Sequence, residues 1–157
     1  MKCIAALAIV AVTGLALCPP AWPQDETDKA QDEVHDLVYP SDLLKVEPYR
    51  SAWDAMLKGA KVNAWITKYS KTYDGVESPL RTIQVDGENY KIANVCKPHS
   101  CASDFLYALF PPDGKRAWAL VVGSRLQWLG QPEARLQKVI TDQCTKDENE
   151  VCHSPRR

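Results

Sequence analysis

The sequence lacks an excess of charge of either sign. Its 157 residues include 19 Lys and Arg against 20 Asp and Glu, which gives a formal net charge of -1 at pH 7. Proteins that bind nucleic acids or membrane surfaces usually carry a basic excess, so this balance argues against both classes. No internal repeat is visible. An apolar content of 45% argues against a disordered tail and permits one domain with a hydrophobic core.

Long hydrophobic runs are absent beyond residue 23. Residues 1–23 hold 17 apolar residues and a single charge, that of Lys2. A basic start followed by an apolar run predicts a secretory signal peptide over these residues. A transmembrane anchor is the less favoured alternative, because the run from Cys3 to Cys18 is shorter than the about 20 residues that a span needs. The cleavage site and lipidation of Cys18 stay open.

An acidic segment follows the predicted signal peptide. Residues 24–38 contain six Asp and Glu and one Lys, so we predict a solvated, flexible lead-in. The functional alternative is an acidic arm that steers a basic partner. Removing residues 1–23 takes away Lys2 and no acid, which leaves an exported chain with a net charge of -2.

The pattern of apolar residues predicts an α+β fold, an antiparallel sheet of four or five strands with helices on its faces. The clearest local signal is Asp86-Gly87 between two alternating runs, which predicts a two-residue hairpin that pairs Ile83 with Tyr90. The runs 105–110 and 117–122 are apolar on both faces and predict central strands, with a possible edge strand at 126–129.

Helices are predicted on both sides of these strands in the sequence. Apolar residues at helical spacing predict one helix that begins at Pro48 and another over residues 132–143. Ser41 is expected to cap a short helix that ends at Lys45. Residues 61–75 are expected to form a connection with one short strand or turn.

Six cysteines in a chain of this length indicate an oxidising compartment or a metal site. Four lie downstream of the predicted signal peptide: Cys96, Cys101, Cys144 and Cys152. An even number in an exported chain predicts two disulfides.

The most informative segment is residues 96–101, with the sequence Cys-Lys-Pro-His-Ser-Cys, between two predicted strands. In an antiparallel hairpin its two cysteines lie within disulfide reach, about 5.5–6 Å between Cα atoms. Such a bridge holds the four-residue tip in one shape, and Pro98 stiffens it further. We expect Lys97 and His99 to point outward from this rigid tip. A rigid, positively charged tip suits insertion into an anionic cleft, because pre-ordering removes the entropy otherwise lost on binding.

Three other interpretations fit the same residues. The loop is compatible with a structural staple in which His99 is incidental. Zinc binding by the loop cysteines and His99 is a second interpretation, because the Cys-x4-Cys spacing fits the outer range for zinc and Cys144, Cys152 and His153 could complete the site. Export favours oxidised thiols instead. A Cys or Ser100 nucleophile with His99 as base is the least favoured, since neighbouring side chains on a tight loop rarely reach that geometry.

The loop motif resembles the signature of the inhibitor of vertebrate lysozyme family. Residues 56–66, residues 75–90 and residues 128–130 with the helix after them are also similar to that family. The resemblance covers roughly residues 48–143, and the loop is its most specific part. Ser100 stands where the family usually has an aspartate.

The resemblance implies a periplasmic protein of Gram-negative bacteria that inhibits c-type lysozyme, often as a homodimer, without catalysis, cofactor or metal. It implies a five-stranded antiparallel sheet with helices on both faces. By position, His99 enters the lysozyme active-site cleft, the Cys96–Cys101 disulfide holds it, and Lys97 and Pro98 shape the tip. The alternative function is a periplasmic binding or stress-related module of the same fold without lysozyme inhibition.

The cysteines also suggest how the chain is divided. We predict a lysozyme-inhibitor-like domain over residues 39–143 and a C-terminal tail over residues 144–157. A second disulfide, Cys144–Cys152, is expected to staple this tail after the last helix.

Overall fold

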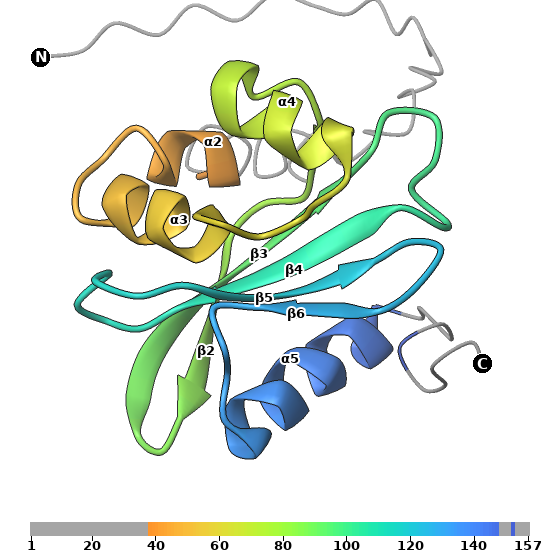
Figure 1. Ribbon diagram of the computed structural model, residues 1–157. Helices are drawn as coiled ribbons and strands as arrows, with labels where there is room; N and C mark the ends of the chain where they lie inside the picture. The colour runs from red at the N-terminus through yellow and green to blue at the C-terminus, as the bar shows by residue number, and fades with distance from the viewer. Residues whose placement is uncertain (1–37, 148–151, 153–157) are drawn as a thin grey trace, which may run out of the picture. The chain divides into compact units, whose positions relative to one another are not determined.

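A computed structural model of the chain describes residues 38–147 and Cys152. The predicted signal peptide and all of the acidic lead-in except residue 38 lie outside these residues. The described part folds as an antiparallel sheet with helices on both faces, which confirms the predicted α+β fold (Figure 1). It contains no helix that is long and apolar enough to cross a membrane.

The sheet is built from short strands that follow one another along the chain. They are β1 (Val76–Glu77), β2 (Arg81–Val85), β3 (Glu88–Cys96), β4 (Phe105–Phe110), β5 (Trp118–Val122) and β6 (Gln127–Leu129). The strand order is β1-β3-β4-β5-β6, and β2 also pairs with β3. β1 and β2 thus share one edge of the sheet, interrupted around Pro79, a residue that has no N–H for a ladder hydrogen bond.

The predicted hairpin is confirmed in detail. Ile83 pairs with Tyr90 and Val85 with Glu88 across the two-residue turn. Asp86 and Gly87 have φ values of 52° and 83°. Positive φ at both central residues is what the preferred hairpin turn requires, and Asp-Gly adopts it at low cost.

Helices cover the two faces of the sheet unequally (Figure 1). α2 (Pro40–Leu43), α3 (Tyr49–Leu57) and α4 (Ala64–Thr72) lie over one face, and α5 (Ala134–Lys146) lies over the other. Each face has its own cluster of buried apolar side chains. All six residues of β4 are buried, alternately in one cluster and the other, which confirms the prediction of a central strand.

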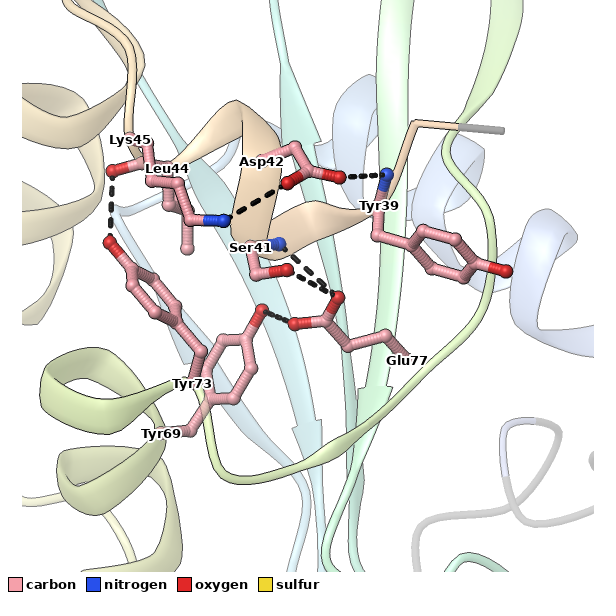
Figure 2. Close-up of polar contacts among 8 residues, drawn as sticks. All are labelled: Tyr39, Ser41, Asp42, Leu44, Lys45, Tyr69, Tyr73 and Glu77. Carbon is pink, nitrogen blue, oxygen red and sulfur yellow. Dashed lines mark hydrogen bonds and ion pairs between the residues drawn. The ribbon is translucent and has the colours of Figure 1, made fainter. Parts of the chain in front are cut away.

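Two predictions about the helical layer are wrong. Residues 61–75 contain α4 rather than a strand or turn, because Ile66 and Tyr69 face the core and are fully buried. Ser41 does not cap α2, which begins one residue earlier, at Pro40. The hydroxyl of Ser41 instead donates a 2.8 Å hydrogen bond to Glu77 of β1 (Figure 2).

The predicted helices at Pro48 and at residues 132–143 are present with adjusted ends. Pro48 immediately precedes α3, whose predicted apolar stripe is buried at Ala52, Trp53 and Met56. α5 extends to Lys146, so Cys144 lies inside the last helix and not after it, contrary to expectation. The additional turn of α5 carries this cysteine into the core, where its side chain is fully buried.

Candidate functional site

The loop between β3 and β4 is closed at its base by the two strands. Cys96 pairs with Phe105 at the end of the ladder, and the N–H of Lys97 donates a 2.9 Å hydrogen bond to the carbonyl of Asp104. The connection therefore covers residues 97–104 and is longer than the predicted four-residue tip. The predicted tip covers only residues 97–100, whereas β4 begins at Phe105, so the prediction leaves out residues 102–104.

Both predicted disulfides are present in the structure. Cys96 and Cys101 are bonded with their Cα atoms 4.9 Å apart, and Cys144 and Cys152 with theirs 6.1 Å apart. Cys101 is exposed, whereas the other three cysteines are buried. The Cys96–Cys101 bridge links the loop tip to the end of β3. The Cys144–Cys152 bridge links the last turn of α5 to Cys152.

The tip of the loop is a tight turn over residues 97–100. The N–H of Ser100 donates to the carbonyl of Lys97 at 3.0 Å. Pro98 occupies the second position, where its fixed φ is favourable, and His99 occupies the third with a φ of 63°. A positive φ at the third position is typical of a type II turn and costs a residue other than glycine about 1–2 kcal/mol.

Backbone hydrogen bonds hold this turn from below. The carbonyl of Ser100 accepts from the N–H groups of Ser103 and Asp104, at 3.0 and 2.8 Å. The loop conformation is fixed jointly by these hydrogen bonds, the disulfide and the strand pairing. Because several interactions hold it, the strained φ of His99 can persist. Contacts within the protein therefore hold the loop in this shape.

The side chains at the tip are available for a partner. Lys97 and His99 are exposed, and neither side chain makes a hydrogen bond or ion pair with any residue that the structure describes. Pro98 and Ser100 are partly buried beside them. The four predicted binding residues thus come together on one loop, which presents hydrogen-bond donors and positive charge outward.

The cysteines considered for zinc binding or nucleophilic attack are not free in the structure. All four cysteines that a zinc site would use are bonded in disulfides. In residues 38–147 and Cys152, no group of three or more His, Cys, Asp or Glu could hold a metal ion. His153 lies outside the described residues. The loop thiols are also not free to act as nucleophiles.

The edge strand beside the loop is fastened to the helical layer by Glu77 (Figure 2). The hydroxyl of Tyr69 donates to its carboxylate at 2.6 Å, and Ser41 donates both its hydroxyl, at 2.8 Å, and its N–H, at 3.3 Å. Burial, and then the hydrogen bond to Glu77, raise the pKa of Tyr69. The neighbouring Val76 pairs with Cys96, so this network steadies the strand that flanks the loop disulfide.

A groove of about 590 Å³ lies next to the loop and was not predicted. Cys96 and Cys101 line it together with Val76, Asn94 and Asp147, among others. These residues come from β1, β3, the loop and the end of α5. No local sequence pattern could have found them, because only the fold brings these segments together.

Comparison with protein-family models and with curated proteins finds related sequences in both. Residues 48–140 match the family model described as inhibitor of vertebrate lysozyme (Ivy). An uncharacterized protein of Yersinia pestis is 32% identical over 124 residues, which cover 69% of this chain and 78% of that protein.

Relatives from two bacterial species carry the family's name. The inhibitor of vertebrate lysozyme of Pseudomonas aeruginosa is 28% identical over 124 residues, again 69% of this chain and 78% of its own length. That of Escherichia coli K12 is 32% identical over 96 residues, 61% of this chain and 51% of the relative. Because the family model matches more than half of this sequence, the chain belongs to the inhibitor of vertebrate lysozyme family.

Proposed function

We propose that this protein is exported to the periplasm and inhibits c-type lysozyme by inserting the tip of its β3–β4 loop into the active-site cleft. Lys97, Pro98, His99 and Ser100 are the residues that contact the enzyme. The Cys96–Cys101 disulfide keeps them in the inserted shape. In this proposal the protein has no catalytic step and needs no cofactor or metal.

The observation that carries this proposal is the position of His99. It is an exposed side chain with no hydrogen bond or ion pair to any described residue, at a strained position of a turn that a disulfide and several backbone hydrogen bonds hold in place. A loop that is already ordered loses little conformational entropy on binding, so more of its contact energy becomes affinity.

The chemistry of the target matches an imidazole. A retaining glycosidase has two carboxyl groups about 5–5.5 Å apart. An imidazole has two ring nitrogens on opposite sides, and both donate when the ring is protonated. His99 can therefore hydrogen-bond toward both carboxyl groups and exclude sugar and water, with about 1.5–3 kcal/mol for each charge-assisted bond.

An activity titration tests this function. Increasing amounts of the purified chain from residue 24 onward are added to a c-type lysozyme that digests labelled peptidoglycan, with a peptidoglycan hydrolase of unrelated fold as the control. We expect stoichiometric loss of lysozyme activity and no effect on the control enzyme. Full lysozyme activity at micromolar protein contradicts the proposal.

Ser100 favours one alternative, a binding module of the same fold that does not inhibit lysozyme. The family usually has an aspartate there, and serine supplies no negative charge beside the histidine. The variant Ser100→Asp separates the alternatives. If the native chain is inactive and this variant inhibits, the serine has removed the function from this member of the family.

A further inference from the structure

The loop tip supplies only part of the surface that a stable complex needs. Specific interfaces bury about 800 Å² on each partner, contributed by about 20–30 residues. Insertion of residues 97–100 into a cleft therefore brings further surface of this protein against the rim of that cleft. The fold determines which surface this is, since it must adjoin the loop.

The groove beside the loop is the adjoining surface on the face that α5 covers. Cys96 and Cys101 both line the groove, so the disulfide that holds the loop tip also forms part of the groove's surface. α5 packs over β4 and β5. In the part of the chain that the structure describes, the groove beside β1 remains open, with about 590 Å³ of space.

Val76 gives this groove an exposed apolar side chain. Its exposed fraction is 49%, and among the described residues only Val38 and Val46 are other large hydrophobic residues with comparable exposure. Val76 pairs with Cys96 across the β1–β3 ladder, so the two side chains lie on the same face of the sheet. A single exposed valine is ordinary, but this one borders both a groove and a pre-ordered loop.

The polar groups of the groove already have partners. Arg81 donates two hydrogen bonds to Asp147, at 2.9 and 2.7 Å. The hydroxyl of Ser78 donates to the side-chain carbonyl of Asn94 at 3.1 Å, and the amide nitrogen of Asn94 donates to the carbonyl of Leu106 at 3.3 Å. The described residues of the groove therefore offer no unpaired charge to an ion, and the groove suits an uncharged, apolar group.

We propose that the lysozyme held by the loop also contacts this groove, and that an apolar side chain at the rim of its cleft packs against Val76. This inference rests on the proposed function and extends its interface. The same lysozyme is the expected occupant because the groove is continuous with the loop and supplies surface that the tip alone lacks. The disulfide then supports both contacts.

Matched variants of exposed valines test the second contact. Val76→Asp places a charge in the groove, and Val46→Asp places the same charge at an equally exposed site between α2 and α3. We expect Val76→Asp to raise the inhibition constant at least about tenfold and Val46→Asp to leave it within about twofold. Val76→Thr keeps the β-branched shape of the strand residue and is the second variant in case Val76→Asp folds poorly. We expect it to raise the inhibition constant severalfold.

The outcomes separate this inference from the proposed function. If the native chain inhibits and both Val76 variants inhibit equally well, the groove contact is wrong and the loop function stands. Contacts of the Val76 methyl groups with residues 148–157 in nuclear Overhauser spectra of the free protein would also overturn it, because the chain's own tail would then occupy the groove. If the native chain does not inhibit, the proposed function fails, and this inference fails with it.

Discussion

The hydroxyl of Tyr69 on α4 donates a 2.6 Å hydrogen bond to the carboxylate of Glu77 on β1. This bond connects the helical layer to the strand edge that runs beside the loop (Figure 2). The carboxylate also accepts from Ser41, which lies 36 residues away in the sequence, so α2, α4 and β1 meet at one side chain.

Removing the hydroxyl of Tyr69 should lower the stability of the protein and should also weaken the dependence of that stability on pH above about pH 10. We expect Tyr69→Phe to reduce the free energy of unfolding by about 1.5–3 kcal/mol, because a hydrogen bond to a charged group is lost. The raised pKa of Tyr69 means that the unfolded chain ionises near pH 10.0 while the folded chain keeps the proton. The native protein should therefore lose stability above that pH, by up to about 1.4 kcal/mol per pH unit more than the variant.

Urea denaturation between pH 7 and pH 11 measures both effects. Tyr39→Phe is the matched control, since the hydroxyl of Tyr39 makes no hydrogen bond with the residues described. Tyr90, whose pKa is raised first by burial, is present in every protein compared and does not distort the difference. Identical alkaline slopes for the native chain and Tyr69→Phe would rule out the assignment of this effect to Tyr69.

The positive φ of His99 predicts opposite responses of stability and function. His99→Gly relieves the strained backbone, so stability should be maintained or rise by up to about 1 kcal/mol, while lysozyme inhibition is lost. His99→Val should lose about 1–2 kcal/mol, because a β-branched residue tolerates this conformation poorly. Thermal unfolding of the three proteins checks the order, and a glycine variant less stable than the valine variant contradicts the turn geometry.

Exposure of the two disulfides predicts the order of their reduction. Cys101 is exposed, whereas Cys144 and Cys152 are 0% and 7% exposed, so a thiolate reaches the loop bridge first. Mild dithiothreitol should open Cys96–Cys101 and weaken inhibition while helix content stays constant. Alkylation followed by peptide mass spectrometry identifies the reduced pair. Undiminished inhibition with both loop thiols alkylated would show that pre-ordering of the loop is unimportant.

The acidic lead-in should accelerate binding to a basic enzyme. Residues 38–147 carry 15 Lys and Arg against 12 Asp and Glu, whereas residues 24–37 carry six acids and one lysine. c-type lysozymes are basic, so the lead-in supplies the attraction that the domain lacks. Replacing its six acids by amides should slow association severalfold at low salt and hardly at all near 1 M salt, where screening is strong. Stopped-flow association rates that are equal at low salt contradict this role.

Local signals in the sequence predicted the parts of the fold that local chemistry decides. Asp86-Gly87 identified the hairpin because few residue pairs accept positive φ at two consecutive positions. The runs that became β4 and β5 were recognisable because a strand covered on both faces is apolar throughout. The loop disulfide was predicted correctly from the short spacing of Cys96 and Cys101, although Cys101 lies inside a longer connection and Cys96 pairs with Phe105 in the ladder.

The parts of the fold that the sequence did not predict depend on contacts between segments far apart in the chain. α4 contains Thr, Ser and Tyr, which have modest helix propensity, and packing against Trp53 and the sheet overrides that preference. The four-residue spacing of Trp65, Tyr69 and Tyr73 was the available signal. Ser41 could not be assigned locally, since its partner Glu77 lies 36 residues away.

The central claim is that His99 carries inhibition, and one comparison tests it most directly. The inhibition constants of the native chain and His99→Ala for c-type lysozyme are measured side by side, with circular dichroism to verify that both are folded. Loss of two charge-assisted hydrogen bonds of about 1.5 kcal/mol each predicts that the variant inhibits about 10²-fold more weakly. Equal inhibition by the folded variant would contradict the account.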